Sequence, residues 1–490
     1  MNGKLKGIIA CVAVVVCLVG ALVVLKVTDK KDDEGSSSAT SSAAESQIEA
    51  IVLTAYSTDD IASVDVSNKH GKFTVEKSET GKQAWEIKLL DGLNQSVSDE
   101  TSLISDAAAL QAKKVAEKDA ENLSKYGFDK PQGKFVINLE DKSKRTFIIG
   151  DNLPEEKNTC YIKQDDSNTV YTISTVSVQH FLSDKKDFLD MTLIKNPEEE
   201  EAEYGKLTVS RPDLKKPLIF TDDNADVENS MMSAQVMISP IFSYLNGTNS
   251  TATTHGLWGM TATHAEVLFP KAQDFAKYGI DKPLATVLYS GNGNEYKFRI
   301  GNPIYAKDSE GKATTTIEAH FCYLEGVSDV DCIWVVPIDS LPWTTVVPED
   351  VITSVMTYND ITSLDSIKAA TSGKTTTYTV EADDKDITAA YIDGKETDVD
   401  QFKSFYQFIL TCPTAEIYSV DPKGESFLTI DIKSQIGGDK LEFFSDSTTE
   451  RKAIVKLNGI TSYRIPVKWT EKFIKNITLL AEGKDVEESY

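Results

Sequence analysis

The sequence predicts an α+β protein in which an N-terminal transmembrane helix is followed by three tandem repeats, each a mainly antiparallel β-sheet with one or two packed helices. Three observations lead to this prediction. One turn motif occurs twice, 152 residues apart, and its neighbours repeat with it. An uncharged apolar segment lies near the N-terminus. Runs of alternating apolar residues surround short helical patterns along the rest of the chain.

Residues 1–28 are predicted to form a cytoplasmic tail and a transmembrane anchor. Residues 8–25 carry no charge, follow two lysines and precede Lys26. At ~1.5 Å per residue, a helix of this length spans about 27 Å, which is enough to cross the core of a bilayer. A cleaved signal peptide is the alternative, although no small-residue cleavage site is present after the segment. We therefore expect contact with the membrane through residues 8–25, in a single-pass cell-membrane protein whose bulk is extracytoplasmic.

The segments that flank the repeats differ from them in composition. Residues 29–57 are rich in Ser and Ala and acidic, which predicts a flexible tether leading into the first repeat. The repeats themselves are predicted at residues 58–196, 203–346 and 357–480, and residues 481–490 form an acidic tail.

The first two repeats share a turn and the segments on its C-terminal side. The first contains "LSKYGFDKPQG" from Leu123 and the second "FAKYGIDKPLA" from Phe275. Each turn leads into an apolar run and then into a second glycine, in "TFIIGDN" and "KFRIGNP". The two glycines lie 23 residues apart in the first copy and 22 in the second. This regular spacing indicates a repeated structural unit.

The third copy is degenerate. "YSVDPKGESFLTIDI" retains Tyr418 and Asp421 in step with the first copy but has Ser419 at the first glycine position. "EFFSD" corresponds to "FIIGD", with Ser445 at the second glycine position. The front halves of copies one and three also agree, as in "FTVE" and "YTVE".

The repeated turn is predicted to end a short helix. Glycine at positions 127 and 279 can take the left-handed conformation that closes a helix, and the proline after it keeps the helix from continuing. Phe128 and Ile280 are then placed to pack back on the last turn. We expect Ser419 to end its helix less well. The alternative is that Tyr, Asp and Lys of this turn form a ligand site.

Two longer segments predict helices that pack on the sheets. In "DETSLISDAAALQAKKV", Leu103, Ala107 and Leu110 lie on one face, and "DVDQFKSFYQFIL" is its counterpart in the third repeat. The strands alternate in character and are joined by hairpin-type turns, so the sheets should be mainly antiparallel.

Charge and cysteine content exclude some classes of protein. The formal net charge of −25 disfavours binding to nucleic acid. The four cysteines outside the apolar segment show no CxxC spacing. Cys322 and Cys332 flank a predicted hairpin turn and are expected to face each other, bonded or not.

The first repeat resembles the DUF4340 family, a family of uncharacterised proteins. The residues that occupy the places of the family pattern are Trp85, Ile87, Tyr126, Gly127, Asp129, Pro131, Gly150, Tyr161 and Tyr171. The resemblance extends over the second repeat from about Asp274 and more loosely over the third. It implies a membrane-anchored envelope protein that accompanies an ABC-type transporter, including the gliding-like kind, and it implies no catalytic residues.

Motifs that carry chemistry are not found in the sequence. The five histidines form no HExxH pattern, and no nucleophile elbow or phosphate-binding loop occurs. The segment from Asp222 begins like a calcium loop, but Val227 stands where glycine is required, so we interpret it as an acidic loop. We therefore predict no catalytic, cofactor-binding or metal-binding residues and no cofactor.

The sequence is consistent with two functions from different classes. The first is a non-enzymatic, membrane-anchored extracytoplasmic repeat protein, an accessory or partner-binding component of an ABC-type envelope transport or gliding-like assembly. Its partner would be a multi-span permease or another envelope protein. The alternative is an anchored cell-envelope hydrolase or carbohydrate-active protein whose site has no recognisable motif.

Overall fold

The computed structural model describes residues 50–490 apart from 80, 82, 199–204, 223–231, 292, 384 and 436. The predicted anchor at residues 1–28, with its transmembrane segment 8–25, lies outside the described residues. So do most of the predicted tether and most of the acidic loop after Asp222.

The first large sheet has eight strands, all paired antiparallel. In order across the sheet they are β4 (Trp85–Glu86), β3 (Gly71–Lys77), β2 (Ile61–Asn68), β7 (Gly133–Leu139), β8 (Lys144–Asn152), β9 (Thr159–Gln164), β10 (Val170–Ser174) and β6 (Lys114–Glu117). A separate two-stranded sheet pairs β1 (Ile51–Val52) with β5 (Gln111–Ala112).

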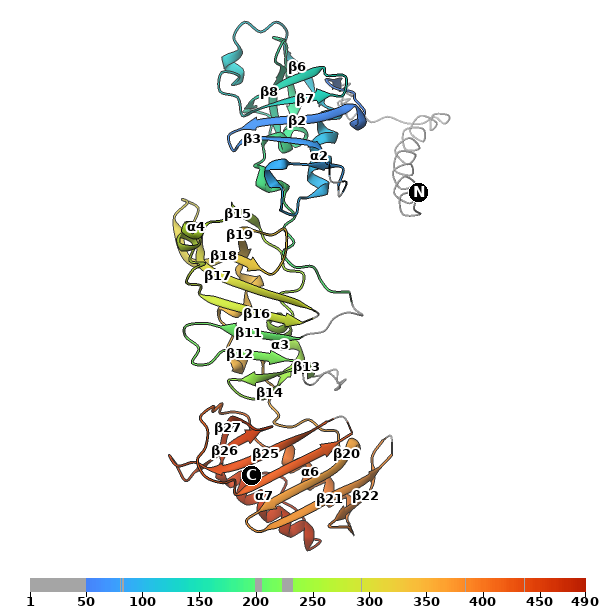
Figure 1. Ribbon diagram of the computed structural model, residues 1–490, viewed down its shortest axis with the longest axis vertical. Helices are drawn as coiled ribbons and strands as arrows, with labels where there is room; N and C mark the ends of the chain where they lie inside the picture. The colour runs from blue at the N-terminus through green and yellow to red at the C-terminus, as the bar shows by residue number, and fades with distance from the viewer. Residues whose placement is uncertain are drawn as a thin grey trace, which may run out of the picture. The chain divides into compact units, whose positions relative to one another are not determined.

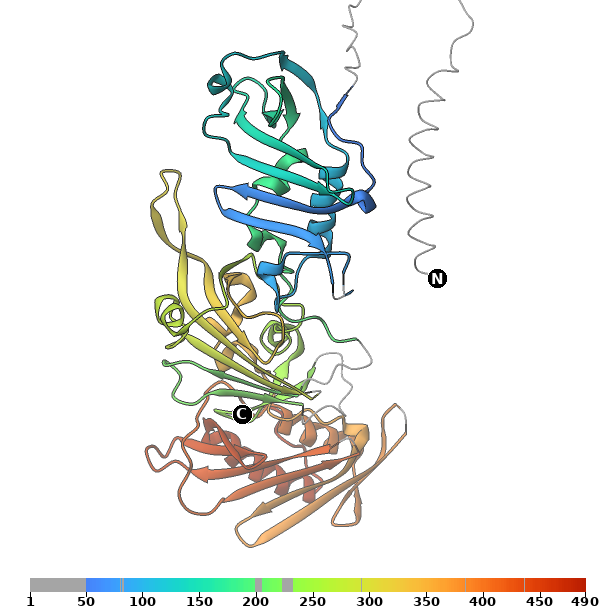
Figure 2. The ribbon, with the colours of Figure 1, turned by 45° about the horizontal axis from the view of Figure 1, so that its top comes forward.

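The second large sheet has nine strands. In order across it they are β14 (Ser243–Asn246), β13 (Met232–Ser239), β12 (Leu218–Thr221), β11 (Lys206–Ser210), β16 (Ala285–Gly291), β17 (Asn294–Lys307), β18 (Ala313–Glu325), β19 (Cys332–Pro337) and β15 (His264–Leu268). Strands β17 and β18 continue beyond their neighbours as a two-stranded hairpin (Figure 2).

The third large sheet has eight strands. They are β23 (Lys395–Thr397), β22 (Ile387–Ile392), β21 (Lys374–Ala382), β20 (Leu364–Thr371), β24 (Leu428–Ser434), β25 (Gly437–Ser445), β26 (Lys452–Leu457) and β27 (Ile460–Pro466).

The three sheets share one topology (Figure 1). In each, three consecutive strands form a meander. Four later consecutive strands form a second meander that begins beside the first strand of the first one, which gives the orders β4-β3-β2-β7-β8-β9-β10, β13-β12-β11-β16-β17-β18-β19 and β22-β21-β20-β24-β25-β26-β27. The sequence repeat therefore corresponds to a repeated antiparallel sheet, in which hairpins connect the strands within each half and a longer-range pairing joins the two halves.

Six α-helices and several 3-10 turns accompany the sheets in the described part of the chain. The α-helices are α2 (Val97–Ala108), α3 (Gly247–Thr254), α4 (Ala272–Tyr278), α5 (Pro348–Val351), α6 (Val399–Leu410) and α7 (Val467–Ala481). The 3-10 helices are η1 (Thr58–Asp60), η2 (Lys88–Leu90), η3 (Leu123–Tyr126), η4 (Val176–Leu182), η5 (Lys185–Phe188), η7 (Ile338–Ser340), η8 (Pro342–Thr344) and η9 (Ile361–Ser363).

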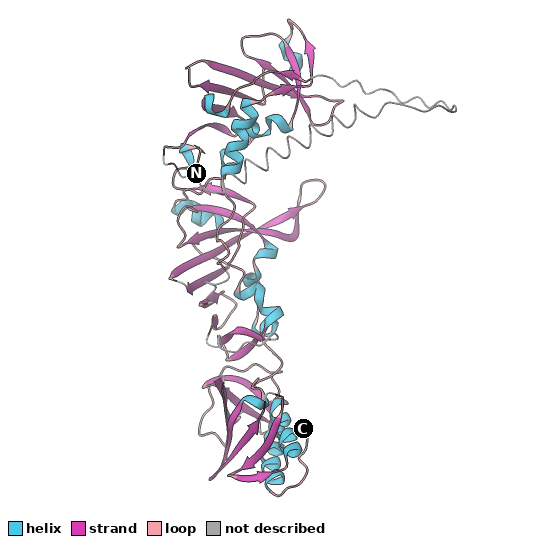
Figure 3. Ribbon diagram, turned by 90° about the vertical axis from the view of Figure 1, so that its right-hand side faces the viewer, coloured by secondary structure: helices cyan, strands magenta, loops and turns pink. Residues whose placement is uncertain are grey.

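The helices bury one face of each sheet. Helix α2 packs on β2 and β4 of the first sheet, whereas α6 and α7 lie together on the third sheet, as Figure 3 shows. Strand β7 illustrates this division, because Phe135 and Ile137 are fully buried while Lys134 and Val136, which alternate with them, are not. The opposite face of the sheet therefore carries the alternate side chains.

The α+β prediction is wrong, because the chain is mainly β, with 43% of residues in strands and 21% in helices. Several segments with a short helical pattern form only one 3-10 turn, such as Leu123–Tyr126, which ends at the left-handed Gly127 after four residues. The N-terminal transmembrane helix that was part of this prediction is not supported either. Within Ala50–Tyr490 as described, every helix is too short or too polar to cross a membrane.

The predicted helix end at the repeated turn is confirmed in the first two sheets. Gly127 follows η3 with φ 80° and ψ 13°, and Gly279 follows α4 with φ 74° and ψ 19°. Both values lie in the left-handed region that glycine enters without a Cβ clash. The chain then turns directly into β7 or β16.

The second glycine of the motif allows the helix end and a central strand to touch. A Cβ added at Gly150 would overlap the carbonyl oxygen of Tyr126, and one added at Gly301 would overlap that of Tyr278. Because these obstacles are backbone atoms, a side chain could be accommodated only by moving the helix end away from the strand.

The third sheet departs from this pattern, and the predictions for Ser419 and Ser445 are wrong. Ser419 lies in an irregular segment rather than at a helix end, and nearby Ile417 forms an isolated bridge to Tyr463. The bond from Phe427 N to Phe443 O matches those from Gln132 to Ile149 and from Leu284 to Ile300. This register places Phe444, not Ser445, at the second glycine position, which a large side chain can occupy because no helix end approaches.

The cysteine prediction is also wrong in register. Cys322 lies opposite Trp334 across β18 and β19, so Cys332 is offset by two residues. All four described cysteines are free and buried. Burial raises the pKa of the Cys160 thiol to about 11 and that of Cys332 to about 12, which suits inert core residues.

A buried carboxylate connects the second and third sheets. Asp439 is 2% exposed and accepts hydrogen bonds from the hydroxyl of Tyr244 at 2.6 Å and of Thr357 at 2.6 Å. The side-chain amides of Asn359 and Asn458 donate to it at 3.0 and 2.9 Å. With four donors the buried charge is well satisfied, so this contact holds its partners firmly in place.

We expect Gly301→Ala to lower the free energy of unfolding by about 1–3 kcal/mol, the usual cost of forcing an extra group into a packed site. The control is Gly394→Ala, where the added methyl meets no atom within 4 Å and only the left-handed conformation costs free energy, about 1 kcal/mol. Urea denaturation of both variants measures the difference. Equal losses would contradict the close approach.

Candidate functional site

The polar groups of the repeated turn bind one another in the first two sheets. The hydroxyl of Tyr126 donates to Glu117 on edge strand β6, and Lys125 also binds that carboxylate. The Lys125 ammonium lies 4.7 Å from the centre of the Tyr126 ring. The hydrogen bond from Lys125, and then that from Tyr126, lowers the pKa of Glu117.

The second sheet repeats this arrangement with different residues. The hydroxyl of Tyr278 donates to Glu266 on β15 at 2.9 Å, and the Lys277 ammonium lies 4.6 Å from the centre of the Tyr278 ring. The ring also packs on Phe321, just as Tyr126 packs on Tyr161. Tyrosine, lysine and glutamate thus stabilise the turn through hydrogen bonds and cation–π contacts.

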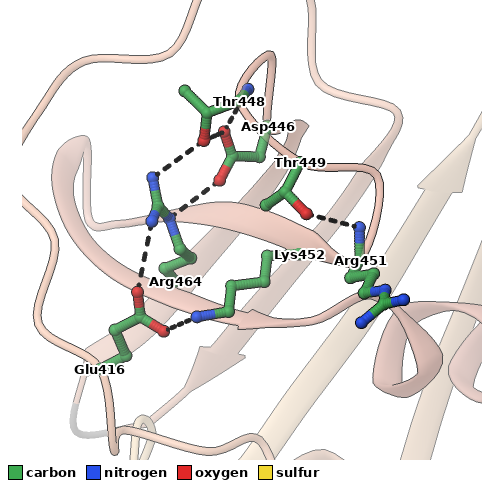
Figure 4. A network of polar contacts seen from close by, with 7 residues as sticks. All are labelled: Glu416, Asp446, Thr448, Thr449, Arg451, Lys452 and Arg464. Atoms are coloured by element: carbon green, nitrogen blue, oxygen red, sulfur yellow. Dashed lines mark hydrogen bonds and ion pairs between the residues drawn. The ribbon is translucent and has the colours of Figure 1, made fainter.

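An ionic network takes the place of this turn in the third sheet (Figure 4). The guanidinium of Arg464 on β27 lies 4.1 Å from the Tyr418 ring, and its Nε lies 2.8 Å from the carboxylate of Asp446. Glu416 binds both Arg464, at 3.4 Å, and Lys452. The Asp446 side chain is 1% exposed, so it needs this cation.

The pKa of Asp446 is lowered by a balance of opposing causes. Burial by itself raises it, but hydrogen bonds from the hydroxyl and backbone of Thr448 and the charge of Arg464 outweigh burial. The carboxylate is therefore ionised and paired in the native state. In all three sheets the turn residues pair with one another through hydrogen bonds or ionic contacts, which favours a structural role for the motif over a ligand site.

The five histidines lie in separate places. His180 Nδ1 is 2.7 Å from Asp106 and connects η4 to α2, and His320 is buried with its Nδ1 2.9 Å from the Gly301 carbonyl oxygen. Burial lowers the pKa of His255 and of His320. Within the described ranges, no group of three or more His, Cys, Asp or Glu residues is arranged to hold a metal ion.

The first sheet has a hollow of about 780 Å³ on the face that the helices leave uncovered. Its lining includes the alternate residues of β2, β3 and β7, which are Asp65, Ser67, Lys72, Thr74, Lys134 and Val136. Lys88 and Leu89 of η2 form part of its wall, and the Leu89 side chain is 56% exposed.

The second sheet has a hollow of about 520 Å³ that includes Thr208 of β11, Leu288 of β16 and Lys297 of β17. These three residues form one row across the sheet, and the row continues to Glu325 of β18. Leu288 is 43% exposed. By hydrogen-bonding register β11 and β16 correspond to β2 and β7, so both hollows lie over the same two strands of the repeated sheet.

The hollows combine charged and apolar side chains without a buried catalytic group. Lys134 pairs with Asp165 at 2.9 Å and Lys88 with Glu76 at 2.9 Å, while Asp65 accepts a hydrogen bond from Thr74 at 2.7 Å. Such a surface can bind another macromolecule through paired charges around exposed leucines. The alternation in the sequence predicts which residues of a strand point outward, but it does not predict that β2 and β7 are neighbours in the sheet.

Glu100 is the other notable group that sequence reasoning missed. It is 0% exposed, and neither carboxylate oxygen has a hydrogen-bond partner among the described residues. A signal was present, because Leu103, Ile104 and Ala107 come after it at helical spacing and would place it on the apolar face.

We expect Arg464→Met to lower the free energy of unfolding by about 3 kcal/mol, because it leaves the buried Asp446 carboxylate without its cation. The matched control is Arg451→Met in the same hairpin, since the Arg451 side chain points away from the network (Figure 4). Urea denaturation, with hydrogen exchange to localise the change to β25–β27, measures both. Equal effects of the two substitutions would show that the network contributes little.

Comparison with known proteins identifies the first repeat. Residues 96–216 match the model of the family described as Domain of unknown function (DUF4340). The match begins at the N-cap of α2 and runs through the glycine turn to the strands beyond it, which confirms the resemblance seen in the sequence. No curated protein and no solved structure matches the chain. The chain is a DUF4340 domain-containing protein.

Proposed function

We propose that this chain is a non-enzymatic, partner-binding protein that works by contact through the uncovered faces of its sheets. We propose further that it is an accessory component of an ABC-type envelope transport or gliding-like assembly, with a multi-span permease or another envelope protein as the partner. The envelope role rests on the family resemblance, and the mode of action rests on the surface.

The observation that carries the proposal is the recurrence of a hollow over equivalent strands. One lies over β2 and β7 and the other over β11 and β16, each on the face away from the helices. The buried face and the turns of these sheets are accounted for by packing. The uncovered faces are not needed for packing, so their shape and side chains are free to serve binding.

The chemistry of these faces suits a protein partner. Leu89 and Leu288 are exposed beside lysines and acids, a mixture of apolar and charged groups typical of transient interfaces. The net charge of −25 would repel the phosphates of a nucleic acid and would attract a basic protein surface.

To test the proposal, a photoreactive amino acid is placed at Leu288 in the full-length chain, and crosslinks are identified in native cells. We expect recovery of a multi-span permease or another envelope protein. Leu284 provides the matched control, because it is also a leucine, is 42% exposed and lies outside the hollow.

Three results would count against the proposal. Equal crosslinking from Leu284 and Leu288 would mean that the hollow is not the contact. Recovery of only soluble cytoplasmic proteins would reject the envelope role. Substrate turnover by the purified chain that is lost in His180→Ala would favour the hydrolase alternative, since His180 and Asp106 form the closest histidine–carboxylate pair in the described part of the chain.

A further inference from the structure

Glu100 is a fully buried carboxyl group for which the described residues provide no hydrogen-bond partner. It lies on helix α2, is 0% exposed, and neither of its oxygens receives a hydrogen bond in the described part of the chain. A buried carboxylate without donors is strongly disfavoured, so the folded state should hold Glu100 in its neutral, protonated form.

The charged groups around Glu100 favour the same state. Helix α2 packs on β4, β2, η1 and η4. Strand β4 brings Glu86, which is 8% exposed and accepts a hydrogen bond from Ser78, and α2 itself carries Asp99. Of the other packed elements, η4 brings His180, whose imidazole is paired with Asp106 at 2.7 Å.

The remaining charges on these packed elements belong to Asp59 and Asp60 of η1 and to Asp65 of β2. Asp60 binds the backbone of Ser57, and Asp65 accepts hydrogen bonds from Thr74 and Asn138. No cation is therefore placed to compensate Glu100 in the described surroundings. Burial, then the charges of Asp99 and Glu86, raise the pKa of Glu100 to about 8.

Both ends of α2 are held by hydrogen bonds to neighbouring segments. At the N-terminal end, Ser96 N donates to Phe188 O at 2.7 Å, and Gln95 forms an isolated bridge to Leu189. At the C-terminal end, the Thr54 hydroxyl donates to the Ala107 carbonyl at 2.8 Å, and Tyr56 N donates to Ala108 O at 3.0 Å. Between these ends, Glu100 lies near Glu86 of β4, an edge strand of two residues that in the described part of the chain pairs only with β3. A disturbance at Glu100 should therefore open the α2–β4 contact and leave the centre of the sheet intact.

Strand β4 also leads directly into the wall of the first hollow. Glu86 is followed by Ile87 and then by η2, whose Lys88 and Leu89 line the hollow. Ile87 N donates to the side chain of Gln95 at 2.7 Å. This hydrogen bond joins the segment to the residues just before α2, so we expect the two to move together. A change at the α2–β4 contact would thus reach the uncovered face through two residues of chain.

We propose that the α2–β4 contact is a pH-sensitive latch, closed while Glu100 is protonated and released when it ionises. Release shifts Lys88 and Leu89 and so alters the first hollow. The observations that support the latch are the burial of Glu100 and the shortness of edge strand β4. Its effect on binding rests on the function proposed above.

The direction of the pH dependence is set by proton linkage. In the unfolded chain Glu100 titrates near 4.5, and in the folded chain near 8. Between these values the closed state holds one proton more than the open state, so closing weakens as pH rises. The opening constant should increase up to tenfold per pH unit in this window and level off above it.

Hydrogen exchange of the full chain, followed by mass spectrometry and corrected for intrinsic rates, tests the latch. Between pH 6 and 7 we expect protection of residues 85–87 and 97–104 to fall several-fold, up to tenfold, while protection of β7 stays constant. In Glu100→Gln, which cannot ionise, protection of the same segments should not change with pH.

The control Glu121→Gln removes an exposed glutamate that follows β6, at the opposite edge of the same sheet from β4, and should keep the wild-type pH dependence. Glu100→Met, an apolar substitution of similar size, provides a second variant and should also abolish it. A pH dependence that survives in either Glu100 variant, or its absence from the wild type, would overturn the latch. Because exchange is measured without a partner, this outcome is independent of the crosslinking result at Leu288.

Discussion

A glycine in a central strand lies directly against the carbonyl oxygen of the tyrosine that ends the preceding helix, and the first two sheets depend on this contact. Gly150 meets Tyr126 in one and Gly301 meets Tyr278 in the other. The approach brings the tyrosine ring onto the next strands and its hydroxyl to a glutamate on the edge strand. One missing side chain thereby allows helix end, sheet centre and sheet edge to be held together.

The third sheet has the same topology, but a different set of contacts takes the place of the glycine–tyrosine contact. Without a helix end at this place, Phe444 can occupy the position of the glycine, and Ile417 keeps only a single bridge to β27. Arg464 then connects Tyr418, Glu416 and Asp446, so charged groups stabilise what packing stabilises elsewhere. The three repeats therefore share their strand order but differ in the contacts that hold their last strands.

The same architecture leaves one face of the sheets without the contacts that stabilise the other. Helices and turn clusters lie on one face and at one end of each sheet, and the charged groups of the turn clusters pair with one another. The opposite face carries exposed leucines among paired charges. Glu100 is an exception within the buried layer, because it is an uncompensated acid next to a two-residue edge strand. We therefore expect the packing of α2 on β4 to depend on the protonation of Glu100.

Local sequence determined the features that depend on neighbouring residues. The glycine helix ends at positions 127 and 279, the helices α2 and α6 and the antiparallel hairpins were all readable, because backbone conformation and side-chain period are local properties. Tertiary structure decided the rest. The predominance of strand, the place of Phe444 and the offset of Cys332 depend on register, which is set by pairing between distant strands. The hollows and the isolation of Glu100 likewise exist only where separate strands and a helix meet, because burial and shape are properties of the assembled sheet.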